Sequence, residues 1–336
     1  MQSLPKVELH LHLDCSLSYK VVSHLRPGTT QEEFRHTYVA PSKCSSLSEF
    51  LTRAPYLVAL MQTEEALRLV VADLFEQLAA DNVIYAEMRF APLLHLDKGL
   101  TPEKVVAVVN GEVESQIRAT GIEARVLLCT LRHYSREQSM KTAELVRQFR
   151  GSTVAGLDIA GDEAAYSLEP HQPAYDYAHE HGLFATAHAG EGAGAESVWE
   201  TLRLLKPSRI GHGVRSGEDS ALVQHLKQHA IHLEVCPSSN VQTNMCADLR
   251  RHPVDRLYRD GVSLGINTDC RTIGDTTLDR EYCRLEEAFA WAADEFYRCN
   301  REALRAAFLP ADERRILATR LDRAYASHSA AVKTIP

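Results

Sequence analysis

The sequence predicts an α/β fold in which eight parallel strands alternate with helices and close into a (β/α)8 TIM barrel. Eight apolar runs bounded by turn residues are separated by segments with helical periodicity. Parallel neighbours need long crossover connections, and helices usually supply them. An open doubly wound sheet is the alternative, but no G-x-G-x-x-G or G-x-x-x-x-G-K-[ST] motif follows any expected strand.

The expected elements follow in chain order. The strands are expected at 6–14, 83–92, 123–133, 154–163, 184–191, 209–213, 232–240 and 263–269. Segment 64–80 predicts a helix, because its apolar residues recur at spacings of three and four: Leu67, Val70, Val71, Leu74 and Leu78. Similar periodicity predicts helices over 102–119, 136–149, 195–205, 217–229 and 254–260.

Two regions add to the plain barrel. The connection 15–80 is too long for a simple loop, and its apolar stretch 47–61 predicts an extra helix pair, a lid over the active site, or both. The tail from Asp279 predicts helices that close the barrel, with a stripe of Tyr282, Leu285, Ala288, Phe289 and Ala292. Without a repeat or a linker, residues 1–336 are expected to form one domain.

Composition limits the classes of partner. The 37 Lys and Arg against 45 Asp and Glu give a net charge of -8, which disfavours nucleic acid and acidic lipid as partners. No stretch approaches the ~18 apolar residues of a membrane span, and the first residues do not resemble a signal peptide. Eight cysteines without a C-x-x-C pair indicate reduced, mostly structural thiols. We therefore expect a cytoplasmic protein, with its oligomeric state left open.

Polar residues gather where the expected strands end. His10 and His12 point to the same side of the first strand, because strand side chains alternate. In a barrel, the carboxyl ends of all strands share the face that carries the active site. Three histidines and one carboxylate suit a catalytic zinc site, and we expect one ion per chain held by His10, His12, His188 and Asp269. Such an ion lowers the pKa of bound water to about 7, which predicts a hydrolase.

Two further residues complete the predicted chemistry. Glu191 lies three positions after His188 and is expected to donate a proton to the substrate. His212 is expected to orient the nucleophile and to stabilise developing charge. Each residue alone could be a hydrogen-bonded strand end, whereas the whole set together favours a site.

Five segments together resemble the signature segments of the adenosine deaminases, in the same order and through nearly the whole chain. They are LPKVELHLHLD at 4–14, GDE at 161–163, HAGE at 188–191, GHG at 211–213 and NTD at 267–269. The resemblance implies a zinc (β/α)8 barrel that converts adenosine and 2′-deoxyadenosine to inosine and 2′-deoxyinosine with release of ammonia.

The resemblance also implies residue roles. His10, His12, His188 and Asp269 would bind zinc, and Glu191 would protonate purine N1 as hydroxide adds to C6. His212 and Asp269 would share the catalytic step with Glu191. The substrate would contact the Gly161 amide at N3, Asp14 at a ribose hydroxyl, and His12 near the ribose.

The chain departs from the family pattern at two positions. Cys15 stands where the family commonly has Gly, and Cys270 stands where it commonly has a second Asp. That Asp is the group expected to meet purine N7, so either N7 is contacted differently, for example through water, or the substrate differs. A nucleophilic Cys270 is disfavoured, because no neighbouring residue in the sequence would activate its thiol.

Alternatives within the family are a deaminase of free adenine or of a 5′- or N6-substituted adenosine. Asp14 favours a nucleoside, since relatives acting on the free base often have Glu there. A nucleoside-binding protein without activity is disfavoured because every catalytic position is filled. A two-metal hydrolase is disfavoured because Ala160-Gly161 stands where a bridging lysine would be expected.

Other rim residues are open to two interpretations. Arg89 and His133 are either part of the active-site surroundings or structural ion pairs and strand-end hydrogen bonds. Ser238, Ser239 and Asn240 are expected to end the seventh strand, close to the metal.

Overall fold

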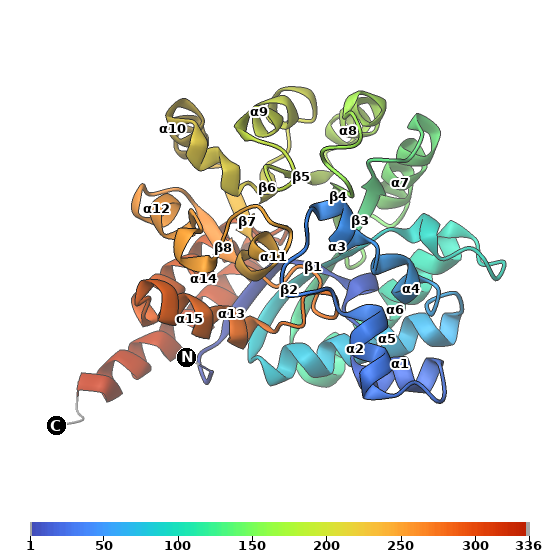
Figure 1. Cartoon of the computed structure of the whole chain (residues 1–336), viewed down its shortest axis with the longest axis horizontal. Helices are drawn as coiled ribbons and strands as arrows, with labels where there is room; N and C mark the ends of the chain where they lie inside the picture. Colours follow the sequence, from blue (N-terminus) through green and yellow to red (C-terminus); the bar gives the residue numbers. More distant parts are fainter. Residues whose placement is uncertain (1, 334–336) are drawn as a thin grey trace.

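A computed structural model describes residues 2–333 of the chain. Its eight parallel strands are hydrogen-bonded in the order β1 to β8, with β8 joined to β1 by a bridge between Leu11 and Asp269. The strands are β1 Lys6–His12, β2 Val83–Phe90, β3 Glu123–Leu131, β4 Val154–Ala160, β5 Phe184–Ala189, β6 Arg209–His212, β7 His232–Val235 and β8 Leu264–Ile266. The predicted (β/α)8 TIM barrel is confirmed, with helices around the strands (Figure 1).

The crossover helices other than α8 agree closely with the periodic segments. The crossover helices are α5 Glu64–Ala80, α6 Pro102–Thr120, α7 Arg136–Gln148, α8 Gln172–Glu180, α9 Ala195–Leu204, α10 Ser220–Gln228 and α12 Val254–Arg259. Helix α10 begins later than expected, because 214–218 forms a 3-10 turn and Asp219 caps the helix by accepting the Ala221 N–H. The prediction omitted α8.

The strands end earlier than predicted, and the seventh differs most. The strand ends at Val235, and residues 237–242 form helix α11 Pro237–Gln242. Proline suits the first turn of a helix, since its φ is fixed near the helical value and it lacks an N–H that would need a partner. Ser238, Ser239 and Asn240 therefore belong to a helix, and their assignment to the end of a strand was wrong.

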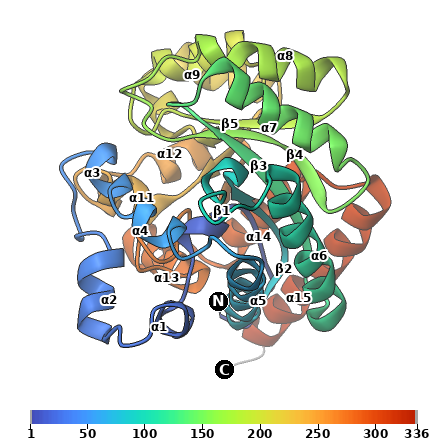
Figure 2. The same ribbon diagram turned by 90° about the vertical axis from the view of Figure 1, so that its right-hand side faces the viewer.

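The long connection after β1 contains four short helices, and the last two are the helix pair predicted within 47–61. The four are α1 Tyr19–Leu25, α2 Gln31–Tyr38, α3 Leu47–Leu51 and α4 Ala54–Val58. Segment 40–44 is tied to α11, since the Cys44 N–H donates to the Gln242 carbonyl at 2.8 Å. Figures 1 and 2 both show α3 beside α11. Phe50 and Leu57 are buried, so this region packs on the barrel as expected.

Three helices complete the chain: α13 Leu278–Phe289, α14 Ala293–Ala306 and α15 Ala311–Lys333. Helix α14 contacts β1, β7 and β8, and Asn300 accepts the Val7 N–H at 2.7 Å, so the tail buttresses the barrel as predicted. The predicted stripe was wrong at its end. Helix α13 stops at Ala290, whose φ of 55° is left-handed, and Ala292 is exposed.

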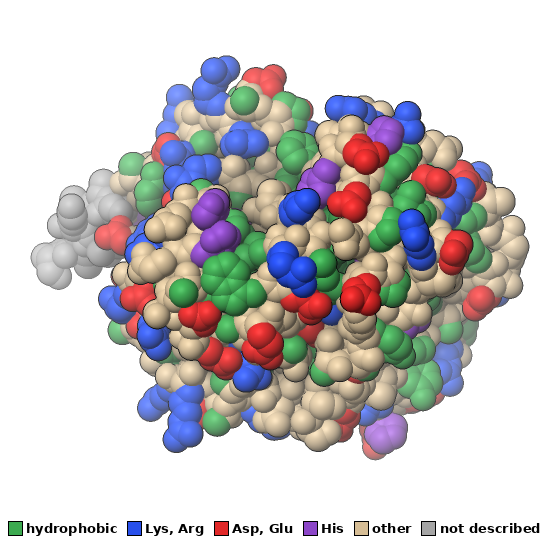
Figure 3. Space-filling model, turned by 90° about the horizontal axis from the view of Figure 1, so that it is seen from above, with side chains coloured by type: hydrophobic (Ala, Val, Ile, Leu, Met, Phe, Trp, Pro, Cys, Tyr) green, Lys and Arg blue, Asp and Glu red, His purple; other side chains and the backbone are tan. Residues whose placement is uncertain are grey.

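The surface seen from above carries Lys, Arg, Asp and Glu side chains interspersed with one another (Figure 3). Within residues 2–333, none of the helices combines the length and the apolar character needed to cross a bilayer.

Candidate active site

Four side chains meet at the carboxyl end of the barrel. His10 and His12 come from alternate positions of β1, His188 from β5, and Asp269 from the residues just after β8. One ligand-type atom from each lies within 4.8 Å of the others. Asp269 Oδ1 is 3.4 Å from His10 Nε2 and 3.3 Å from His12 Nε2, and the Nε2 atoms of His12 and His188 are 3.2 Å apart. The structure thus brings together the whole predicted ligand set.

Carboxylates orient two of these imidazoles. Glu234 Oε2 lies 2.9 Å from His10 Nδ1, and Asp158 lies 3.2 Å from His188 Nδ1. With the Nδ1 proton donated to a carboxylate, each Nε2 lone pair faces the centre of the cluster, which is the usual arrangement of metal-binding histidines. Arg89 donates to Asp158 and Glu234 at 2.7 Å each, so it belongs to the surroundings of the site and is also a buried ion pair.

The donor set fits a divalent cation such as zinc. His10 Nε2 is buried without a hydrogen-bond partner, which is costly unless a ligand satisfies it. Burial lowers the pKa of His188 to about 4, so this imidazole is neutral at pH 7, the form that binds metal. Three imidazoles and one carboxylate, without a thiolate among the four, are ligands typical of a catalytic site.

Asp269 is held at the seam of the barrel. Its carbonyl accepts the His12 N–H at 2.8 Å and its own N–H donates to the His10 carbonyl at 3.0 Å. Its φ is 65°, a left-handed conformation that Asp tolerates better than most residues. Ser239 Oγ donates to Asp269 Oδ2 at 2.7 Å. Burial opposes ionisation, but the neighbouring imidazoles hold the Asp269 pKa well below its usual range.

Glu191 and His212 form a pair beside the cluster. Glu191 Oε2 lies 3.4 Å from His212 Nε2, and Glu191 Oε1 is buried without a partner. Burial and the charge of Asp269 raise the pKa of Glu191 well above its usual value, which favours the protonated acid. Burial lowers the pKa of His212 well below its usual value. A proton donor and a neutral imidazole therefore lie side by side.

Asn240 fixes the tautomer of His212. Its Nδ2 donates to His212 Nδ1 at 3.1 Å, which leaves the His212 proton on Nε2, facing Glu191. His252 Nε2 lies 3.2 Å from Asn240 Oδ1 and holds the amide in turn. Sequence reasoning placed Asn240 near the metal but did not foresee this contact, because it read the residue as part of a strand.

Glycine is required beside this pair. A Cβ on Gly211 would lie 2.9 Å from His10 Cε1 and 3.3 Å from the His188 Cα. The histidine cluster therefore needs glycine at this strand position.

Glu163 holds the loop that carries Glu191. Its carboxylate accepts hydrogen bonds from Ser197 Oγ and from the N–H groups of Gly190, Glu191, Gly192 and Ala193. Both of its oxygens are occupied, so Glu163 is a positioning residue rather than a second proton donor. Sequence reasoning missed this role, although the GDE motif contained the signal. It also missed Glu234, whose signal was a carboxylate inside an apolar strand.

The cluster opens into a cavity of about 670 Å³. His12, Asp14, Gly161, Glu191 and His212 all line it, together with an apolar wall from the α3–α4 region that includes Phe50, Leu51 and Val58. Asp14 Oδ2 accepts the Ala91 N–H at 3.1 Å, and Gly161 has a φ of 103° that favours glycine. His133 lies at the rim and is exposed.

Cys15 and Cys270 also line this cavity. Cys270 Sγ is 3.8 Å from Asp269 Oδ1. Its interaction with the neighbouring Cys15 thiol, together with burial, raises the pKa of Cys270 well above its usual value. A reactive thiolate is therefore disfavoured, as expected from the sequence.

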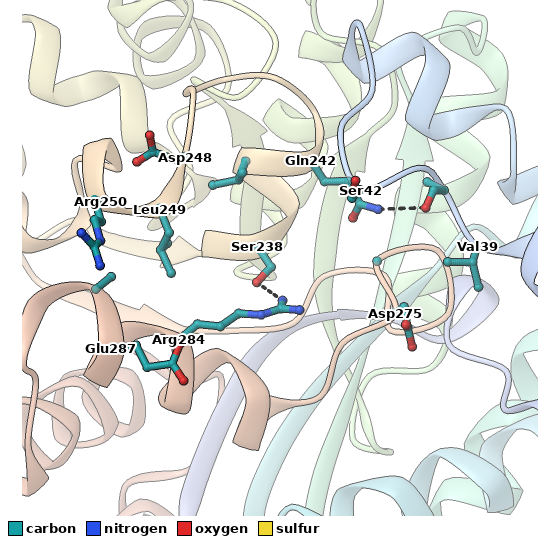
Figure 4. Close-up of a pocket in the computed structure, with 14 residues that line it drawn as sticks. Val39, Ser42, Ser238, Gln242, Asp248, Leu249, Arg250, Asp275, Arg284 and Glu287 are labelled. Carbon is teal, nitrogen blue, oxygen red and sulfur yellow. Dashed lines mark hydrogen bonds between the residues drawn. The ribbon is translucent and has the colours of Figure 1, made fainter.

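A second cavity of about 700 Å³ is lined by Ser238, Val241 and Gln242 of α11 (Figure 4). Ser238 lines it and accepts a hydrogen bond from Arg284. Of the three residues predicted near the metal, Ser239 and Asn240 contact site residues, whereas Ser238 faces this second cavity.

A (β/α)8 barrel with histidines and a carboxylate clustered at the carboxyl ends of its strands is typical of metal-dependent hydrolases. Comparison with known proteins narrows this class. The family model described as "Adenosine deaminase" matches residues 5–324. The chain belongs to the adenosine deaminase family.

The similar sequences and solved structures match this chain over nearly its whole length. The adenosine deaminase of Enterococcus faecalis is 34% identical, covering 97% of this chain and 98% of that protein. The adenosine deaminase of Mycobacteroides abscessus is 37% identical, with 92% of each chain covered. The crystal structure of adenine deaminase from Arthrobacter aurescens superposes with a TM-score of 0.88 at 25% identity, covering 96% of this chain and 99% of the other. The N6-mAMP deaminase of Arabidopsis gives 0.86 at 25% identity, with 96% and 98% covered.

Proposed function

We propose that the chain is a zinc-dependent aminohydrolase that converts adenosine and 2′-deoxyadenosine to inosine and 2′-deoxyinosine with release of ammonia. The observation that carries this proposal is the Glu191–His212 pair, which lies beside the cluster of His10, His12, His188 and Asp269 within one cavity. When bound, zinc lowers the pKa of water and so supplies a nucleophile at neutral pH.

The residues of the chain perform the remaining steps. Protonated Glu191 donates its proton to purine N1, which makes C6 electrophilic. The Nε2–H of His212 faces the same point and stabilises the negative charge that develops on the attacking oxygen. As the C6–O bond forms and the C6–N6 bond breaks, the amino group takes up one proton and leaves as ammonia. The added water molecule supplies this proton and the one that restores Glu191, and the proton from Glu191 remains on N1 of the product.

The other lining residues would hold the nucleoside. The Gly161 amide is proposed to donate to N3, and Asp14 to accept a ribose hydroxyl with His12 close by. Asp14 accepts only one backbone hydrogen bond, so its carboxylate keeps capacity for a ligand.

Charge at the cavity distinguishes a nucleoside from a nucleotide. Among the described residues that line it, none is Lys or Arg, whereas Asp14, Asp97 and Asp162 are acidic. A phosphate dianion there would be repelled and would lack a charged hydrogen-bond donor. This composition favours an uncharged 5′ end. A 5′-substituted or N6-substituted adenosine fits the same argument, and free adenine is the other alternative.

We further propose that residues 1–336 act as one metal-dependent hydrolase domain and that the enzyme serves purine salvage in the cytoplasm. Its eight cysteines are all free thiols, which suits a reducing compartment.

A substrate panel tests the proposed function. Purified enzyme with measured zinc content is assayed spectrophotometrically on adenosine, 2′-deoxyadenosine, adenine, 5′-deoxyadenosine, N6-methyladenosine and adenosine 5′-monophosphate. We expect the first two to give the highest kcat/KM and the monophosphate to be a poor substrate. Faster turnover of adenine or of the monophosphate would contradict the nucleoside assignment and leave the metal chemistry intact.

A further inference from the structure

The two positions at which the chain departs from the family pattern lie together in the cavity. Cys15 follows β1 in the 3-10 turn Leu13–Cys15, and Cys270 follows Asp269 after β8. These strands are neighbours at the seam, both thiols are buried, and both line the cavity. We call Cys15 and Cys270 the thiol pair.

The thiol pair lies across the barrel from the proton donor. Glu191 follows β5 and His212 ends β6, whereas the thiol pair belongs to β1 and β8. In a closed ring of eight strands, β5 is opposite β1.

If the proposed function holds, this placement determines which edge of the substrate the thiol pair contacts. In a 6-aminopurine, C6 has N1 on one side and, beyond C5, N7 on the other. With C6 at the ligand cluster and N1 at Glu191, N7 faces the opposite wall. The thiol pair is on that wall, and Cys270 Sγ lies 3.8 Å from Oδ1 of Asp269, a member of the ligand cluster.

We propose that the thiol pair determines specificity by meeting the N7 edge without a strong hydrogen bond. A thiol is a weak donor and packs like a small apolar group, so N7 contributes little to binding. The site therefore accepts purine nucleosides in which position 7 is carbon, a class that a carboxyl group at residue 270 would discriminate against.

Matched ligands test this inference independently of turnover. Isothermal titration calorimetry on the zinc-loaded enzyme compares inosine with 7-deazainosine, which differ only at position 7 and are not deaminated. We expect their Kd values to agree within about tenfold, less than the loss of a strong hydrogen bond produces. A preference for inosine above about tenfold would overturn the proposal.

Variants at residue 270 test whether the thiol pair is responsible for the equal binding of the two ligands. Cys270→Asp, and Cys15→Gly/Cys270→Asp where the single variant is poorly folded, introduce a carboxyl group, which in its protonated form donates a strong hydrogen bond to N7. The preference for inosine should rise at least about tenfold in the variant. Cys283→Asp makes the same change on α13, outside the cavity, and should leave the preference unchanged. An unchanged preference in a folded, metal-loaded Cys270→Asp variant would refute the role of the thiol pair.

A parallel adenosine assay separates the two proposals. Turnover of adenosine with a strong preference for inosine contradicts only the specificity inference. Absence of turnover on every adenine nucleoside contradicts the proposed function, and the inference that rests on it fails with it.

Discussion

The two walls of the cavity differ in the side chains that they place beside the ligand cluster. On the β5–β6 side, Glu163 fixes the loop of Glu191, and Asn240 sets the tautomer of His212. On the β8–β1 side, the thiol pair offers only weak hydrogen-bonding groups. The groups assigned to proton transfer are tightly positioned, whereas one edge of the substrate is met by adaptable, weakly polar side chains. The contrast indicates that reaction chemistry and substrate recognition are separable in this site.

The largest effect is expected at the cluster between the two walls. His188→Ala removes one proposed ligand and opens the site, so we expect loss of bound metal together with loss of all measurable activity. Metal analysis by mass spectrometry and a deamination assay measure both. His24→Ala, on the exposed face of α1, is the control. A fully metallated and active His188→Ala enzyme would end the ligand assignment.

The next largest effect is expected on the β5–β6 side of the cavity. Glu191→Gln keeps the shape of the side chain but cannot donate a proton to N1. We expect turnover to fall by ~10²–10⁴-fold with metal content and Kd for inosine nearly unchanged. Glu200→Gln on the exposed face of α9 should behave as the parent enzyme. Unchanged turnover would move the acid role to another residue.

A stability measurement tests the support behind His212. Burial lowers the pKa of His252 from 6.5 to about 3. Between these values the unfolded chain binds a proton that the folded chain excludes, so stability falls as the pH drops below 6.5. The contribution of His252 to the free energy of unfolding should fall by about 2 kcal/mol between pH 7 and pH 5.

Denaturant titrations at the two pH values measure this contribution. His252→Gln should lose this share of the pH dependence, and the exposed His229→Gln should retain it. Equal pH dependence in all three proteins would show that His252 is not buried as a neutral imidazole.

The smallest effect is expected on the thiol side. Cys270→Ser keeps the size of a side chain that is neither nucleophile nor metal ligand, so most of the kcat/KM for adenosine should be retained. Steady-state kinetics measure this, with Cys283→Ser as the control. Loss of a group that acts in the chemical step lowers the rate by ~100-fold or more. If kcat/KM fell by more than ~100-fold with metal still bound, Cys270 would have a direct part in the reaction.

Most of the fold could be predicted because its signals are local. Apolar runs and helical periodicity located all eight strands and most helices, and residues His10 and His12 share a face by strand alternation alone. The common edge of a parallel barrel then brought His188 and Asp269 to the same place.

The remainder depended on contacts between distant segments. Glu234 and Asp158 orient imidazoles from other strands, and nothing in their own neighbourhoods specifies those partners. The run after β7 was read as strand because its apolar residues continue to Cys236, and the turn at Pro237 was not recognised. The departures Cys15 and Cys270 were visible in the sequence, but their proximity required the closed barrel.

The contact between β8 and β1 that closes the barrel also brings proposed metal ligands together. The backbone of Asp269 exchanges hydrogen bonds with that of His10 and His12, so residues far apart in the sequence are joined there. Such non-local pairing carries a high entropy of loop closure and forms slowly. The barrel cannot close without placing three of the four proposed ligands. Closing the barrel therefore also brings these proposed ligands together, and a chain in which Asp269 is not paired with β1 lacks the cluster.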